Sequence, residues 1–284
     1  MYLGAHIGIS KGLAGAPALG RSIGCDAIQI FSKSPQMWGG PPISAESAQG
    51  FRAGVAQEGL RATAVHHGYL TNLASPKAAG LKRSRSAFLD ELRRAELIGA
   101  DALIVHPGAH LGSGVDAGVA RVSESLNEAF AKTEGFRVRT LLENMAGQGS
   151  TLGAQFTELA RIRDGVDDRN RLGFALDTCH LFAAGHDFRT PESYGSLVDR
   201  IGSEIGLETV RAFHLNDAKG PLASHRDRHE NIGKGEIGLE GFRHFVGDAR
   251  WADRPGFLET PLTGDDYAVY RADLATLRSL EPGA

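Results

Sequence analysis

The stretch SAFLDELRRAELIGADALIVH, residues 86–106, contains one complete helix-to-strand unit. Its first part carries apolar residues at the spacing of one helix face, with a glycine placed to end the helix: Phe88, Leu92, Ala95, Ile98 and Gly99. Its last part, ALIVH, is a continuous apolar run, which is typical of a strand buried on both faces of a parallel sheet. The fold prediction therefore depends on whether this unit recurs along the chain.

Seven further runs of this kind predict seven more strands. They are Tyr2–His6, Ala27–Phe31, Ala62–His66, Arg139–Glu143, Gly173–Asp177, Val210–His214 and Gly256–Glu259. Between them, helical patterns cover Gln155–Arg163, Pro191–Ile205, Leu239–Val246 and Asp265–Leu280. Eight alternations of strand and helix predict an α/β fold of the (β/α)₈ TIM-barrel type. The alternative is an open, doubly wound sheet, but no glycine-rich phosphate fingerprint follows the first run.

The composition fits this prediction. The chain has 284 residues, of which 42% are hydrophobic and 23% charged, so one barrel would occupy residues 1–284 as a single domain. No apolar run reaches the roughly 18 residues of a membrane span, and the N-terminus lacks the charged region of a signal peptide. With only two cysteines, Cys25 and Cys179, a disulfide framework is excluded, and we expect a cytoplasmic protein.

The net charge leaves the partner open. With neutral histidines it is −3, from 31 basic and 34 acidic residues, whereas nucleic-acid-binding domains are usually basic. Several bound divalent cations would reverse this balance locally, because metal ions are often the largest charges in a site.

Histidines and carboxylates stand at the ends of most predicted strands, or in the loop that follows the seventh. There are nine of them: His66, His106, Glu143, Asp177, His180, His214, Asp227, His229 and Glu259. Taken singly, each histidine could be structural, and each carboxylate could cap the helix that follows it. Taken together, four carboxylates at one barrel rim repel one another unless a cation is present, and five histidines supply the neutral donors typical of zinc. The pattern therefore predicts two or three zinc-like ions at the carboxyl end of the barrel.

Five longer blocks resemble the endonuclease IV type of apurinic/apyrimidinic (AP) endonuclease, which belongs to the xylose-isomerase-like TIM barrels. They are His106–Leu111 (HPGAHL), Leu141–Ser150 (LLENMAGQGS), Leu176–Asp187 (LDTCHLFAAGHD), His214–Gly220 (HLNDAKG) and Asp227–Gly238 (DRHENIGKGEIG). The similarity extends from GAHIG at the start of the chain to FLET near its end. It implies a DNA-repair enzyme that hydrolyses the phosphodiester on the 5′ side of an abasic site and leaves a 3′-hydroxyl. It also implies trimming of blocked 3′ ends and a location with the nucleoid DNA. We expect a monomer, because duplex DNA suits one barrel with an open rim.

The resemblance further implies three zinc ions. The first would be held by His66, His106 and Glu143, the second by Asp177, His214 and Glu259 with Glu143 bridging, and the third by His180, Asp227 and His229. Glu143 and Glu259 would act in catalysis, with Glu259 orienting the attacking water.

The family also implies contacts to double-stranded DNA. Tyr69 and Leu70 match positions that insert into the duplex beside the lesion, and residues 33–38 (KSPQMW), including Lys33, Gln36 and Trp38, match a second DNA-contacting loop. The chain departs from the family at Gln36, where an arginine is common, and at His66-His67, where the family commonly reads His-Asp.

A metal-dependent sugar isomerase or epimerase of the same barrel group is the main alternative. Such enzymes use a Glu, Asp, His, Glu set, which Glu143, Asp177, His214 and Glu259 would supply. They have no need of the other five candidate ligands, and that surplus favours the nuclease. A non-catalytic binding protein would gain nothing from nine clustered ligands.

Overall fold

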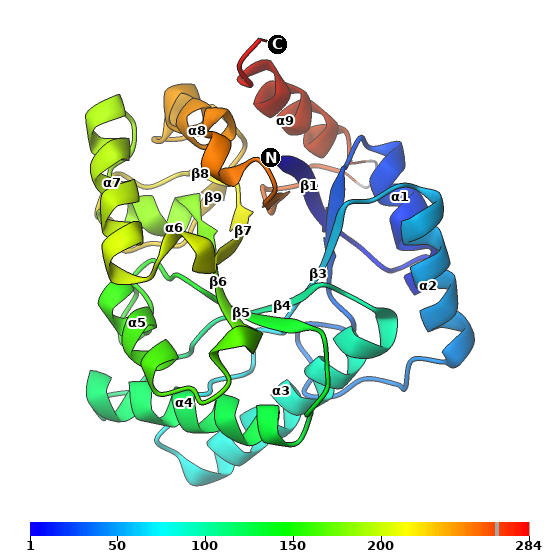
Figure 1. Ribbon diagram of the computed structural model, residues 1–284. Helices are drawn as coiled ribbons and strands as arrows, with labels where there is room; N and C mark the ends of the chain where they lie inside the picture. Colours follow the sequence, from blue (N-terminus) through cyan, green and yellow to red (C-terminus); the bar gives the residue numbers. More distant parts are fainter. Residues whose placement is uncertain (265–266, 284) are drawn as a thin grey trace.

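Eight parallel strands close into a barrel, with the order β1, β10, β7, β6, β5, β4, β3 and β2 around the ring (Figure 1). The computed structural model describes residues 1–264 and 267–283. The barrel strands are β1 (Tyr2–Ile7), β2 (Ala27–Ile30), β3 (Ala62–His66), β4 (Ala102–Val105), β5 (Arg139–Glu143), β6 (Leu172–Asp177), β7 (Val210–His214) and β10 (Pro255–Leu258). The predicted TIM barrel is confirmed, and the open-sheet alternative is wrong.

Helices surround the barrel and connect its strands (Figure 1). They are α1 (Ala16–Ser22), α2 (Ala45–Gln57), α3 (Ala78–Ile98), α4 (Val115–Ala131), α5 (Phe156–Asp164), α6 (Thr178–Ala183), α7 (Pro191–Glu204), α8 (Gly238–Gly247) and α9 (Ala268–Ser279). Helix α3 ends at Gly99 as predicted, in the left-handed conformation with φ 72°. It begins eight residues before the predicted start at Ser86. The predicted start of the last helix, Asp265, lies outside the described residues.

Two apolar clusters stabilise the barrel, one inside it and one between the strands and the surrounding helices. Alternate strand residues point into its interior, where a small cluster fills the space: Ala27, Ala64, Ile104, Leu141, Ala175, Ala212 and Phe257. The residues between them pack outward against the helices and form the larger core. Two positions after six of these interior residues, at the carboxyl end of each strand, the next inward-facing residue is a candidate ligand.

A short antiparallel hairpin lies outside the barrel after β7. It joins β8 (Asp217–Ala218) to β9 (His229–Glu230), and Asp217 is in register with Glu230. The sequence patterns did not predict it. No helix in the described ranges is long and apolar enough to cross a membrane.

Candidate metal centre

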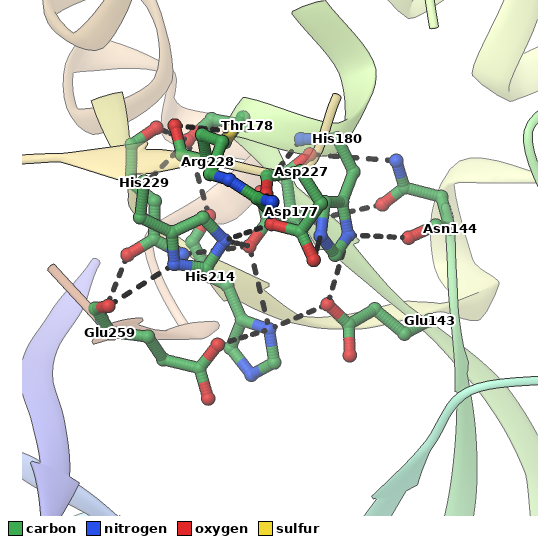
Figure 2. Close-up of polar contacts among 12 residues, drawn as sticks. Glu143, Asn144, Asp177, Thr178, His180, His214, Asp227, Arg228, His229 and Glu259 are labelled. Carbon is green, nitrogen blue, oxygen red and sulfur yellow. Dashed lines mark hydrogen bonds and ion pairs between the residues drawn. The ribbon is translucent and has the colours of Figure 1, made fainter. Parts of the chain in front are cut away.

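The nine candidate ligands come together at the carboxyl end of the barrel. Four of them are the last residues of strands: His66 of β3, Glu143 of β5, Asp177 of β6 and His214 of β7. His106 and Glu259 each follow directly after a strand, and His180 lies in the first turn of α6. The hairpin carries Asp227 and His229 over the same end. Figure 2 shows seven of these side chains pointing toward one another: Glu143, Asp177, His180, His214, Asp227, His229 and Glu259.

The first group consists of His66, His106 and Glu143, whose ligand atoms all lie within 4.8 Å of one another. The Glu143 Oε2 atom is 3.2 Å from His66 Nε2 and 3.1 Å from His106 Nε2. This is the set that the sequence resemblance implies for the first ion.

A second group consists of His180, Asp227 and His229, whose ligand atoms also lie within 4.8 Å of one another. Its two histidine Nε2 atoms lie 3.3 Å and 3.2 Å from the two carboxylate oxygens of Asp227. The hairpin brings these residues together, because β8 and β9 fix the loop that carries Asp227. The Asp217 carboxylate in turn accepts backbone hydrogen bonds from residues 218, 233, 235 and 237, which fixes the hairpin and the segment after it.

His214 lies between these two groups. Its Nδ1 atom is 3.0 Å from Glu143, 3.5 Å from Glu259 and 3.8 Å from Asp177. The middle residues divide into two compact groups: His66 with His214 and Glu259, and Glu143 with Asp177 and His180. Asp177, His214 and Glu259, which the resemblance implies for the second ion, are distributed over these two groups, and His214 Nδ1 lies within 3.8 Å of both carboxylates. Glu143 belongs to two compact groups, which is the position expected of a bridging carboxylate.

Cys179 also lies near possible ligands, in a group with Asp177 and His229. Its Sγ atom is directed at the backbone carbonyl of Arg228, 3.6 Å away. Burial raises the pKa of this thiol to about 12, so the thiolate is strongly disfavoured.

The charges in the cluster balance through the histidines. Burial alone would raise the pKa of the Glu143 carboxyl, but His214 and His106 outweigh it and hold that pKa well below its ordinary value. Burial alone would lower the pKa of His229, but the Asp177 charge and the hydrogen bond with Asp227 raise it to about 9. The histidines and the buried carboxylates therefore offset one another's charge.

The donor set fits divalent ions of the zinc type. Imidazole nitrogens and carboxylate oxygens are ligands that zinc favours, and the cluster mixes the two. His180 Nε2 and His229 Nε2 are buried, and each lies within 3.3 Å of a carboxylate oxygen of Asp227. Two imidazole nitrogens and a carboxylate that face one another in this way are suited to one ion.

Backbone carbonyls hold the second ring nitrogen of three of these histidines. Nδ1 of His66 donates to the His67 carbonyl (2.8 Å), Nδ1 of His180 to that of Asn144 (2.9 Å), and Nδ1 of His229 to that of Glu259 (3.1 Å). Each of these hydrogen bonds leaves Nε2 as the nitrogen that can bind a metal, which is the usual arrangement for a metal-binding histidine. Asn216 supports the carboxylates by donating to Asp177 Oδ2 at 2.7 Å and accepting from the Glu259 backbone at 2.8 Å.

The residues expected to contact DNA lie in two places, beside the metal cluster and in the loop after β2. Tyr69 and Leu70 are exposed at 64% and 41%, and the Tyr69 ring lies 6.3 Å from that of His66, beside the cluster. Gln36 is exposed, and the half-buried Trp38 ring lies under the guanidinium group of Arg83 at 4.8 Å. Met37, which the sequence patterns did not single out, is 57% exposed in the same loop.

The Lys33 side chain is buried and forms ion pairs with Glu91 and Asp90 of α3. These two acidic residues hold its ammonium group away from solvent. A direct DNA contact by Lys33 stays a prediction, and it would require Lys33 to leave these ion pairs.

The fold and the cluster together define a metal-binding TIM barrel, and comparison with known proteins identifies the class. The family model described as "Xylose isomerase-like TIM barrel" matches residues 17–280. The 3-keto-D-glucoside 4-epimerase of E. coli shares this fold, with a TM-score of 0.67 at 16% identity over 98% of this chain and 99% of that one.

Closer relatives narrow the family. A probable endonuclease 4 of Chloroflexus aurantiacus is 44% identical over 281 residues, which cover 99% of this chain and 98% of the relative. The crystal structure of endonuclease IV from Thermus thermophilus matches with a TM-score of 0.85 at 33% identity, over 98% of this chain and 100% of that one. The chain therefore belongs to the endonuclease IV family, a family of DNA-repair endonucleases.

Proposed function

We propose that this chain is a zinc-dependent AP endonuclease whose single catalytic domain spans residues 1–284. It hydrolyses the phosphodiester on the 5′ side of an abasic site in double-stranded DNA and leaves a 3′-hydroxyl. It also trims blocked 3′ ends, and it acts as a monomer on the nucleoid DNA of the cytoplasm. The main support is the meeting of nine histidine and carboxylate ligands, from six strand ends, the first turn of α6 and one hairpin, at one end of the barrel.

We assign about three zinc ions to the cluster. His66, His106 and Glu143 would hold one, His180, Asp227 and His229 another, and the groups around His214 a third. When bound, zinc neutralises charge on the phosphodiester and lowers the pKa of the attacking water. The distances from Glu143 to the histidines on both sides support a bridging role for this carboxylate.

Glu259 is placed to orient the attacking water. Its Oε1 atom is held by Gln29 at 2.6 Å and lies 3.3 Å from His6, while its other oxygen is on the side of His214. A carboxylate that is fixed by one oxygen keeps the other in a constant direction for a water molecule. Tyr69 and Leu70 stand exposed beside the same cluster and suit the space that a missing base leaves in the duplex.

A sugar isomerase or epimerase is the second candidate, because Glu143, Asp177, His214 and Glu259 would supply its ligand set. The group of His180, Asp227 and His229 favours the nuclease, since it forms a further metal site beyond that set.

One gel assay tests the proposal. The zinc-loaded protein is incubated with a duplex that carries a single abasic site and, in parallel, with the same duplex carrying a normal base. We expect cleavage of the abasic duplex alone, with a product that a polymerase extends directly. No cleavage, together with interconversion of a ketose, would establish the isomerase instead.

A further inference from the structure

Gln29 is a buried polar residue inside the barrel, in direct contact with the candidate metal centre. It lies on β2, two positions after Ala27 of the interior cluster, and it is in register with His6 of β1 and Ala64 of β3. Residues two apart on a strand face the same side, so its side chain occupies the next layer of the interior. It is fully buried, and its carboxamide therefore needs partners inside the protein.

Its partners are two of the candidate ligands and one neighbouring histidine. Gln29 Nε2 donates to Glu259 Oε1 at 2.6 Å, and it lies 3.0 Å from His6 Nδ1. On the other side, Gln29 Oε1 lies 2.9 Å from His214 Nε2.

The chemistry of these groups fixes the direction of each bond. An ionised carboxylate only accepts hydrogen bonds, so the amide nitrogen must face Glu259 and the amide oxygen must face His214. The amide oxygen only accepts, so His214 Nε2 carries a proton. His214 Nδ1 faces the carboxylates of Glu143, Asp177 and Glu259, and in the neutral imidazole that binds a metal it would be the unprotonated nitrogen.

His214 differs in this from His66, His180 and His229. Those three are held through Nδ1 by backbone carbonyls, which no substitution removes. His214 is held through Nε2 by a side chain, and the same side chain also holds Glu259.

We propose that Gln29 is the positioning residue for the ion held by His214 and Glu259. Its carboxamide selects the His214 tautomer with Nδ1 free for the metal, and it turns Glu259 so that Oε2 remains on the metal side. Partners of this kind change metal affinity by about 10- to 100-fold when they are removed. The inference rests on the proposed metal centre. It states that Gln29 sets the affinity and the ligand geometry of one of the ions in that centre.

The test compares Gln29→Met with Leu141→Met. Both variants place a methionine inside the barrel, but Leu141 belongs to the interior cluster and Gln29 contacts His214 and Glu259. Zinc affinity is measured by competition with a chelator, and the visible spectrum of the cobalt-substituted protein reports the ligand geometry. We expect Gln29→Met to weaken one ion by about 10- to 100-fold, to change the cobalt spectrum and to lower kcat on abasic duplex with KM unchanged. Leu141→Met leaves zinc affinity and the cobalt spectrum as in the wild type.

Gln29→Glu separates the effect of Gln29 on the His214 tautomer from its effect on the orientation of Glu259. It keeps an acceptor for His214 but replaces the donor to Glu259 with a second carboxylate oxygen, so we expect zinc loss at least as large as in Gln29→Met. Wild-type zinc affinity and an unchanged cobalt spectrum in both Gln29 variants would overturn the inference while leaving the proposed function intact. Equal weakening of all ions in parallel with the melting temperature would also overturn it, because that pattern indicates a structural role. A wild-type protein that binds neither zinc nor cobalt would overturn the proposed function itself.

Discussion

The two layers of the barrel interior differ in almost every chemical respect. The lower layer consists of aliphatic residues and one aromatic ring, all buried and closely packed. The upper layer, one inward-facing position further along the strands, holds buried carboxylates and histidines that balance one another's charge. Burial stabilises the first layer and costs free energy in the second. The lower layer therefore maintains the fold, and the upper layer is retained for chemistry, so substitutions in the two should have opposite consequences.

The largest expected effect on activity comes from Glu259→Gln in the upper layer. The amide keeps the shape of the side chain but removes the charge that orients the water, so turnover on abasic duplex should fall on the order of 1,000-fold or more. Binding to the same duplex should be retained, because the exposed Tyr69 and Leu70 side chains are unchanged. Single-turnover cleavage and a binding titration check the two quantities, and turnover within a few-fold of the wild type would remove Glu259 from the mechanism.

In the lower layer, Ile104→Ala should have the reverse effect. Ile104 is fully buried in the interior cluster, and its truncation leaves a cavity that destabilises the fold by about 2–5 kcal/mol. The number of zinc ions bound by the folded protein should not change. Denaturant unfolding and elemental analysis test this pair of expectations, and loss of zinc without loss of stability would contradict the division into layers.

A pH effect is expected outside both layers, at His186. Burial and the nearby Arg200 lower the pKa of this histidine, whose Nδ1 atom lies 3.0 Å from the guanidinium group and whose Nε2 atom donates to the Ala154 carbonyl at 3.2 Å. The unfolded histidine, with its ordinary pKa of 6.5, therefore takes up a proton at a higher pH than the folded one. The stabilisation is complete above pH 6.5 and declines as the pH falls below it.

Unfolding free energies measured from pH 8 down to pH 5 test this in the wild type and in His186→Gln. The glutamine variant should lose stability less steeply on acidification. Parallel curves for the two proteins would show that His186 does not contribute.

The smallest effect is expected in the loop after β2. Gln36→Arg should tighten binding to abasic duplex by on the order of 1 kcal/mol and steepen its salt dependence by roughly one phosphate contact. The rate of the chemical step should barely move. Conversely, Tyr69→Ala should weaken binding to abasic duplex more than binding to intact duplex. Titrations at two salt concentrations measure both, and an unchanged salt slope in Gln36→Arg would mean that this loop does not reach the DNA backbone.

The sequence predicted the barrel well because its signal is local. Apolar runs such as Ala62–His66 and Arg139–Glu143 coincide with β3 and β5 residue for residue. The start of α3 was missed, since its first turns carry lysine and arginine and show no apolar periodicity before Leu81. The convergence of the nine ligands at one end was also predictable, because parallel strands place their carboxyl ends together.

The features that the sequence did not predict depend on contacts between residues far apart in the chain. The burial of Lys33 is caused by Glu91, 58 positions away in the chain. The hairpin that carries His229 is only two residues long in each strand, too short to give a periodic pattern. Gln29 did leave a signal, a polar residue at an inward position of an apolar strand, but its meaning depends on His214, 185 positions away.

The central claim is that the upper layer is a multi-ion centre, and counting metals by native mass spectrometry tests it most directly. We expect about three divalent ions per wild-type chain. His229→Ala should lose chiefly one of them, whereas Glu143→Ala should disturb two, because Glu143 belongs to two compact groups. A single metal ion in the wild-type protein would contradict the account and favour the sugar isomerase.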